Sequence, residues 1–174
     1  MGWRSFMGLA AILLFAGCGR AITAREARSR LDPAQAVVPS TPSSLSLVDL
    51  ALEAASLPEP RRQIVEAALA HAGMPATGVD CSQLTERVYA ATGIDLPRTA
   101  EQQLAQGQPV EAASLVPGDL VFFAFRRRPA DHVGIFTGQG AFVHVSSASS
   151  NVRLDRLTQD AFAGAYVGAR SYVR

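Results

Sequence analysis

The 174-residue sequence contains no lysine, and all sixteen of its basic residues are arginines. Fifteen acidic residues nearly balance them and leave a net charge of +1, so the chain lacks the basic excess that nucleic-acid-binding proteins carry. It has only two cysteines, Cys18 and Cys81, which are too few for a disulfide framework or a cysteine-rich zinc site. Because 48% of the residues are apolar, the chain can nevertheless bury a core of ordinary size.

Long apolar runs are also missing, except for one at the N-terminus that covers residues 6–17. This run is too short to cross a bilayer as a helix, which takes about 20 residues. Arg4 before the run supplies the positive start of an export signal. The run ends in the letters FAGC, which resemble a bacterial lipobox with Cys18 as the residue that is diacylated. We therefore expect residues 1–17 to be a lipoprotein signal peptide; the alternative is ordinary secretion with an incidental cysteine.

A lipid on Cys18 would anchor the protein to a membrane, and Gly19 after it resembles lipoproteins that are sorted to the outer membrane. We expect the mature protein at the periplasmic face of that membrane. Cys81 is then the only free thiol in an oxidising compartment, where a thiol is a liability unless it is buried or used. Residues 18–58, with their prolines, serines and scattered arginines, predict a flexible tether that contains a short helix over residues 47–55.

Residues 59–174 predict one folded domain in which helices precede strands. Amphipathic spacing predicts a helix over residues 59–73, and a second helix begins at Cys81, with Asp80 as its N-cap and Gln83 completing a capping box. The other predicted elements are a short helix over residues 99–105 and strands over residues 120–125, 132–137, 141–146, 152–157 and 166–172. This order is typical of an α+β fold with N-terminal helices packed on a small antiparallel β-sheet.

The position of Cys81 in the first turn of its helix favours nucleophilic chemistry. The positive end of the helix dipole and the free backbone N–H groups stabilise a thiolate, so we expect a lowered pKa for this thiol. The backbone N–H of Cys81 is also a candidate for stabilising an oxyanion. A nucleophilic thiol needs a base within reach.

The predicted hairpin offers two bases. A three-residue loop would pair Thr137 with Ala141. This register puts His132 and His144 on one face of the sheet. Cys81 would then attack, His132 would accept its proton, and His144 would orient His132 by a hydrogen bond. By residue type the same three side chains could bind zinc, but the cysteine at a helix N-terminus favours nucleophilic use, so we expect no metal and no cofactor.

Several short motifs surround these three residues. In chain order they are Asp80–Ser82, Leu96–Thr99, Pro117–Phe123, His132–Ile135 and Phe142–His144. As a set they resemble the NlpC-type cell-wall peptidases, which are small papain-like bacterial enzymes, and the resemblance covers about residues 60–172. It implies a cysteine endopeptidase of peptidoglycan stem peptides that cuts the bond between D-γ-glutamate and the diamino acid. The nucleophile, base and third polar residue of the family match Cys81, His132 and His144.

The resemblance also places Asp80 and Ser82 beside the substrate subsite, while Arg98 either shapes the cleft or begins its helix. We take these three as candidate substrate-binding residues. Two positions depart from the family pattern: members usually carry a tyrosine where Ala76 stands here, and Gln83 replaces the glycine that usually follows Asp-Cys-Ser. These changes bear on subsite shape and oxyanion stabilisation, and they predict a narrowed specificity or a modest rate.

Three function classes are compatible with the sequence. The first is a hydrolase of peptidoglycan peptides, the second an amidase or acyl transferase with the same thiol chemistry, and the third a catalytically weak, wall-binding lipoprotein. We expect a monomer whose partners are peptidoglycan peptides and, through Cys18, the membrane. We interpret His71, Asp131 and the arginines at 126–128 as structural or solvated residues.

Overall fold

The computed structural model describes residues 46–126 and 129–173. The predicted signal peptide, Cys18 and the predicted tether up to residue 45 lie outside the described residues, as do two of the three arginines at 126–128. In the part of the chain that is described, no helix has the length and apolar content to cross a membrane.

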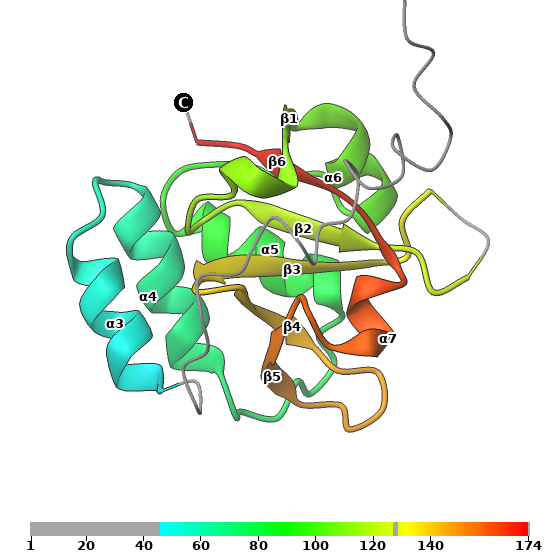
Figure 1. Cartoon of the computed structure of the whole chain (residues 1–174), viewed down its shortest axis with the longest axis horizontal. Helices are drawn as coiled ribbons and strands as arrows, with labels where there is room; N and C mark the ends of the chain where they lie inside the picture. Colours follow the sequence, from blue (N-terminus) through cyan, green and yellow to red (C-terminus); the bar gives the residue numbers. More distant parts are fainter. Residues whose placement is uncertain (1–45, 127–128, 174) are drawn as a thin grey trace, which may run out of the picture. The chain divides into compact units, whose positions relative to one another are not determined.

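The described residues form helices and one antiparallel sheet (Figure 1). The helices are α3 (Leu47–Ala55), α4 (Arg61–His71), α5 (Cys81–Ala90), α6 (Ala100–Gln106), the 3-10 helix η1 (Ala112–Ser114) and α7 (Asp160–Ala163). The strands are β1 (Gln108–Val110), β2 (Leu120–Phe123), β3 (His132–Gly138), β4 (Ala141–Val145), β5 (Val152–Arg156) and β6 (Tyr166–Ser171). The strand order is β1-β6-β2-β3-β4-β5, and every neighbouring pair is antiparallel. The predicted α+β fold with helices before strands is confirmed.

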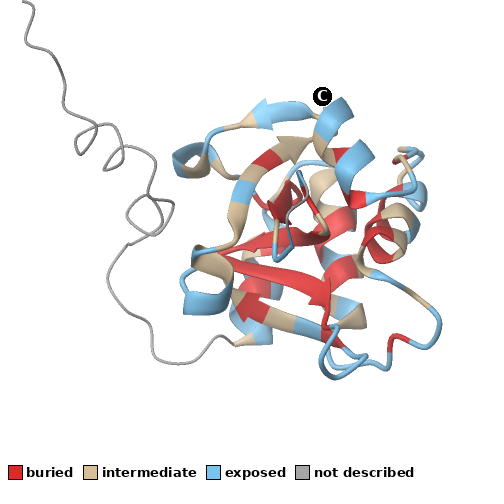
Figure 2. Ribbon diagram, turned by 90° about the vertical axis from the view of Figure 1, so that its right-hand side faces the viewer, coloured by how far each residue is buried: buried red, intermediate tan, exposed pale blue. Residues whose placement is uncertain are grey.

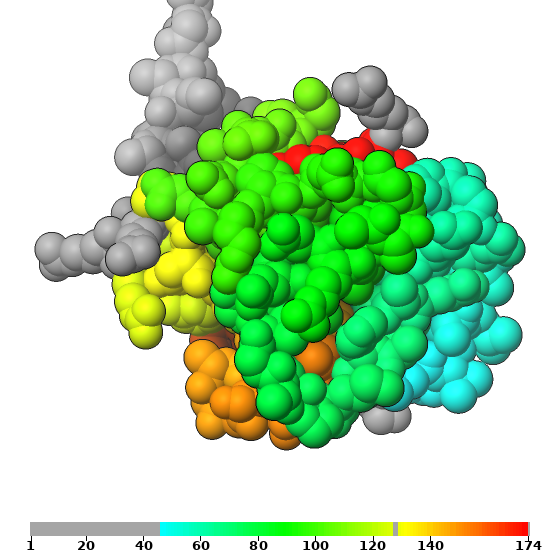
Figure 3. Space-filling model, turned by 180° about the vertical axis from the view of Figure 1, so that it is seen from behind, coloured from blue at the N-terminus to red at the C-terminus, as the bar shows by residue number. Residues whose placement is uncertain are grey.

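Strands β2, β3 and β4 are buried on both faces of the sheet (Figure 2). On one face, Leu84 and Val88 of α5 belong to the same apolar cluster as Val133 and Ile135 of β3. Figure 3 shows this helical side of the molecule, with α5 at its centre and α3 and α4 beside it. On the other face, the aromatic rings of the strands pack with Phe162 of α7. This double burial explains why β2 reads as a continuous apolar run instead of an alternating one.

The start of α5 has the predicted capping box. The Asp80 carboxylate accepts a hydrogen bond from the Gln83 N–H at 2.8 Å, and the Gln83 side chain accepts one from the Asp80 N–H at 3.1 Å. Two N–H groups that the helix cannot satisfy internally are thereby satisfied. Cys81 is fixed as the first residue of the helix.

In the β3–β4 hairpin, His132 and His144 lie on the same face of the sheet, as predicted, but the turn differs from the predicted one. Ile135 pairs with Val143, as the predicted register requires. At the turn, however, Gly138 and not Thr137 pairs with Ala141, so the predicted three-residue loop is wrong. The loop has two residues, with φ angles of 50° and 71°, and a bulge in β3 adds the residue that restores the register. Without this bulge, a two-residue loop would put the two histidines on opposite faces.

Sequence patterns predicted neither β1 nor α7. β1 is a three-residue strand at the edge of the sheet, and it contains Pro109, which an edge position tolerates because one side of the strand needs no N–H donor. α7 has four residues and no side-chain cap. Both elements are too short for their periodicity to be read.

Helix α3 is the short helix predicted over residues 47–55, but it belongs to the folded unit and not to the tether. Leu50 and Ala54 are 0% and 1% exposed, and α3 packs against α4 and β3. The Glu53 carboxylate also accepts a hydrogen bond of 3.2 Å from the side chain of Gln139 in the hairpin turn. The folded unit therefore includes α3 and is not confined to residues 59–174.

This assignment of α3 is testable with two leucines of the same helix. Replacing Leu50 by alanine leaves a cavity in a packed interface, so we expect the free energy of unfolding to fall by about 2–5 kcal/mol. Leu52→Ala is the matched control, because Leu52 is 69% exposed and its loss should change the free energy by less than about 0.5 kcal/mol. Urea unfolding of the two variants measures both values. Equal, small effects would show that α3 does not contribute to the fold.

Candidate active site

Cys81 opens α5, and its thiol is half-buried against the apolar cluster that α5 shares with β3. The sulfur is hydrogen-bonded by the backbone of Val133, the residue that follows His132. Among the described residues, no hydrogen bond joins Cys81 to His132 itself. In free enzymes such contacts are often long and tighten only when substrate binds. The structure thus brings the thiol to the start of β3, beside His132, without joining the two groups.

Burial has the largest effect on the pKa of Cys81 and raises it. The hydrogen bond from the backbone of Val133 acts in the opposite direction, and the negative charge of Asp80 raises the pKa again. The net result is a pKa above the ordinary cysteine value, which contradicts the lowered pKa expected from the helix terminus. The expectation failed because it left out the cost of transferring a thiolate from water into a partly buried position.

His132 at the start of β3 and His144 near the end of β4 meet edge to face. Their ring centroids are 4.9 Å apart, and His132 Nε2 lies 2.9 Å from His144 Nδ1. Gly134 makes this approach possible, because a Cβ there would lie 3.2 Å from the Cβ of His144 and 2.6 Å from a ring carbon of Phe142. The predicted contact between the two imidazoles is present in the structure.

Aromatic rings enclose this pair. The ring of Phe142 stacks on His144 at a centroid distance of 4.9 Å, and Phe162 from α7 meets the same imidazole edge-on at 5.2 Å. Burial lowers the pKa of His132, and the neighbouring His144 lowers it further, to about 4. Burial also lowers the pKa of His144, although the hydrogen bond with Asp155 opposes this effect. Both imidazoles are therefore neutral at pH 7, the state in which an imidazole can accept a proton.

Asp155 on β5 is a member of the site that sequence reasoning missed. Its Oδ2 lies 2.9 Å from His144 Nε2, so three side chains in a row are joined from β3 to β5. Register could have identified it: His144 pairs with Arg153, and residues two apart in a strand share a face. The connection between β4 and β5 contains no short turn signal from which this pairing could be read.

The three candidate substrate-binding residues form one cluster at the start of α5. Arg98 Nη2 lies 2.7 Å from Asp80 Oδ2, and Arg98 Nη1 donates to Ser82 Oγ at 3.1 Å. Partial burial raises the pKa of Asp80, but hydrogen bonds from Arg98, from the backbone N–H of Gln83 and from Ser82 outweigh it, so the net pKa is lowered. Arg98 and Asp80 are half exposed, so solvent screens this ion pair and it adds little to stability.

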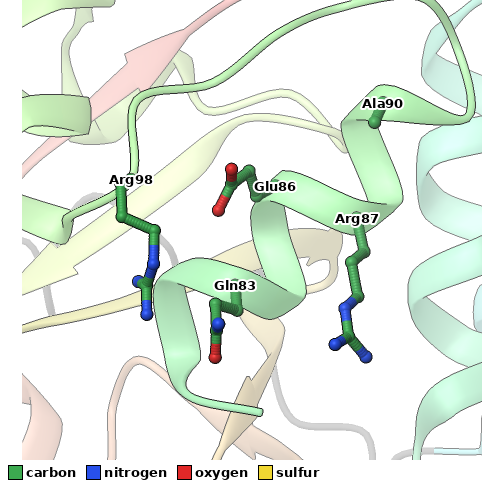
Figure 4. A pocket seen from close by; sticks show the side chains of 5 residues that line it. All are labelled: Gln83, Glu86, Arg87, Ala90 and Arg98. Carbon is green, nitrogen blue, oxygen red and sulfur yellow. The ribbon is translucent and has the colours of Figure 1, made fainter.

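Two surface hollows adjoin α5. The first has a volume of about 300 Å³ and is lined by Gln83, Glu86, Arg87, Ala90 and Arg98 (Figure 4). Arg98 thus belongs both to the Asp80 cluster and to this pocket. The second, of about 170 Å³, is lined by Ala76 together with Val79 and Leu84. The position where the resemblance expects a tyrosine is therefore next to open space.

The residues interpreted as structural have local partners. His71 Nδ1 lies 2.7 Å from the Ala67 carbonyl oxygen, one turn earlier in α4. The Asp131 carboxylate accepts hydrogen bonds from the backbone N–H groups of Phe125 and Arg126, at 2.9 and 2.8 Å, and so closes the loop before β3.

Comparison with known proteins identifies a family and several relatives of this chain. The model of the NlpC/P60 family matches residues 67–171. Murein DD-endopeptidase MepH of Escherichia coli K12 is 39% identical over 100 residues, which cover 55% of this chain and 37% of that protein. Gamma-D-glutamyl-L-lysine dipeptidyl-peptidase of Bacillus cereus is 34% identical over 104 residues, covering 59% of this chain and 31% of that protein. The chain therefore spans only a minor part of the length of these relatives.

Among solved structures, an NlpC/P60 family protein from Bacillus cereus superposes with a TM-score of 0.61 at 29% identity. The superposition covers 67% of this chain and 42% of that one.

The raised pKa of Cys81 predicts how fast the thiol is alkylated at different pH values. Because the thiolate is the reactive form, the iodoacetamide rate should rise with pH around a midpoint above the free-cysteine value of about 8.5. The measurement uses a Cys18→Ser variant, in which Cys81 is the only cysteine. A midpoint below pH 7 would contradict the prediction and indicate a preformed thiolate–imidazolium pair.

Proposed function

Because the chain belongs to the NlpC/P60 family, we propose that it is a cysteine endopeptidase that hydrolyses peptidoglycan stem peptides. The observation that carries this proposal is the hydrogen-bonded pair of neutral imidazoles at the strand end where the thiol of Cys81 lies. A nucleophile at a helix N-terminus, a base beside it and a third group that orients the base are the parts that thiol-dependent acyl transfer needs.

In the proposed reaction, Cys81 Sγ attacks the carbonyl carbon of the scissile amide while its proton passes to His132. The backbone N–H of Cys81 stabilises the negative charge that develops on the carbonyl oxygen. The carbon–nitrogen bond then breaks, and His132 returns the proton to the leaving amine, so that a thioester remains. Water attacks the thioester with His132 again accepting a proton, which releases the carboxylic acid and the free thiol. Since thiol and imidazole are both neutral at rest, the proton moves during attack and not before it.

The proposed target is the bond between D-γ-glutamate and the diamino acid. The cluster of Asp80, Ser82 and Arg98 supports a substrate with both amino and carboxylate groups, because it offers an anionic, a neutral and a cationic hydrogen-bonding group at the start of α5. The two relatives named above carry the names of different peptide specificities. Ala76 and the hollow beside it are the features that would distinguish this chain's subsite from one that holds a tyrosine.

Incubation of the purified full chain with muropeptides tests the proposal. Cys81→Ala removes the nucleophile and His132→Ala the base, so we expect either variant to lose at least about 10²-fold in kcat. Asp49→Ala is the control, because this carboxylate is exposed on α3, makes no side-chain hydrogen bond among the described residues and should leave kcat unchanged. Mass spectrometry identifies the products. Cleavage by Cys81→Ala at the wild-type rate would disprove the mechanism.

The products also separate the remaining function classes. Split stems with new amino groups support hydrolysis, and transfer of the acyl group to an added amine supports an acyl transferase. Binding without turnover is the second candidate function, which the raised pKa of Cys81 and the small side chain of Ala76 favour. It predicts that the wild type and Cys81→Ala retain muropeptides equally and release no fragments.

We also propose that the protein is a monomer held at the periplasmic face of the outer membrane by lipid on Cys18. The support for the anchor is the FAGC sequence, in which Cys18 directly follows an apolar run that is too short to span a bilayer. One acyl chain gives only marginal anchoring, whereas a diacylated cysteine gives a stable anchor.

The anchor is tested by membrane fractionation of Cys18→Ser. Without the thiol that carries the lipid, we expect the protein to leave the outer-membrane fraction and to incorporate no labelled fatty acid. Cys81→Ser is the control, because it removes the other cysteine and should stay with the membrane. If Cys18→Ser cofractionates with the outer membrane as wild type does, the anchor lies elsewhere.

A further inference from the structure

The side chain of Asp155 is buried, although carboxylates are rarely buried without partners. Its oxygens are fully engaged: Arg153 donates from Nε to Oδ2 and from Nη2 to Oδ1, both at 3.0 Å, and Gln159 donates to Oδ1 at 3.2 Å. His144 Nε2 lies 2.9 Å from Oδ2. Packing of β5 alone does not require a carboxylate here, since an apolar side chain could fill the same position without hydrogen bonds from three other side chains.

We propose that Asp155 is a positioning residue that sets the protonated nitrogen of both imidazoles through two successive hydrogen bonds. The inference rests on the proposed function, in which His132 is the base. An ionised carboxylate can only accept hydrogen bonds, so His144 Nε2 must carry a proton. In a neutral His144, Nδ1 then has a free lone pair. It can only accept from His132 Nε2, which leaves His132 Nδ1 unprotonated and able to take the proton of Cys81.

The charges around the carboxylate support its ionised state. Burial raises the pKa of Asp155, but the hydrogen bonds from Arg153, His144 and Gln159 outweigh it, and the net pKa is lowered. The guanidinium of Arg153 faces the carboxylate in the bidentate geometry that makes the strongest ion pairs. Arg153 itself is half exposed, whereas Asp155 is buried, so the guanidinium stabilises the buried negative charge while keeping contact with solvent.

Asp155→Asn tests the proposal because it keeps the shape and removes the charge. The asparagine amide can donate to His144 Nε2, which would move the proton of His144 to Nδ1 and, in turn, place a proton on His132 Nδ1. We expect kcat to fall by at least about 10²-fold with KM unchanged, since Asp155 is buried and its carboxylate is occupied by Arg153, Gln159 and His144. Asp160→Asn is the matched control, because this carboxylate is exposed and makes no side-chain hydrogen bond among the described residues.

Nitrogen-15 spectra of histidine-labelled full chain report the tautomers without any need for turnover. In the wild type we expect protons on Nε2 of both His132 and His144. His71 serves as an internal reference of the opposite kind, because its Nδ1 donates to the Ala67 carbonyl oxygen. In Asp155→Asn we expect the protons of His132 and His144 to shift to Nδ1, while His71 stays as it is.

The outcomes separate this inference from the proposed function. A wild type with the expected tautomers but no hydrolysis would refute the proposed function and support the role of Asp155 in placing protons. A wild type that carries its proton on His132 Nδ1 overturns the inference, as does an Asp155→Asn variant with unchanged tautomers and kcat. If Asp155→Asn does not fold, the wild-type spectrum alone decides between these results.

Discussion

The hydrogen bond between His132 and His144 depends on the register of one hairpin, and the chemistry of the site depends on that bond. A shift of one residue between β3 and β4 would carry one imidazole to the opposite face of the sheet. The bulge near the turn prevents this shift, and the apolar pairs on the other face, among them Ile135 with Val143, hold the register in place. The position of His132, the proposed base, is thus set by packing that has no chemical role of its own.

In the site without substrate, the thiol of Cys81 is protonated. Helix dipole and backbone N–H groups favour a thiolate at Cys81, but burial acts more strongly and keeps the thiol neutral. The ring cluster around His132 and His144 likewise favours uncharged imidazoles. In the proposed reaction the proton therefore leaves the sulfur only during attack, and between turnovers the neutral thiol is less readily oxidised than a thiolate would be.

The sequence predicted those features that are encoded locally. Capping residues around Cys81 identified the start of α5, and the glycine-containing turn led to two histidines on one face even though the turn itself was predicted wrongly. Asp155 escaped prediction because its partner lies on a neighbouring strand across a connection with no defined turn chemistry, so only the folded register shows the contact. Helix α3 was found but assigned to the tether, because helical periodicity does not reveal what the apolar face packs against. The sign of the Cys81 pKa shift also required coordinates, since burial depends on tertiary packing.

Gly134 is needed for the packing of the β3–β4 hairpin and not for a reaction. A methyl group there would collide with the Phe142 ring, but it would also lie 2.9 Å from the backbone carbonyl oxygen of Val143. Smaller side chains at 142 and 144 could relieve the first conflict and not the second. Glycine is thus demanded by how closely two strands approach, whatever reaction the fold performs. A variant without the thiol of Cys81 would need this glycine just as much, so glycine at this position reflects the packing of the two strands and carries no information about activity.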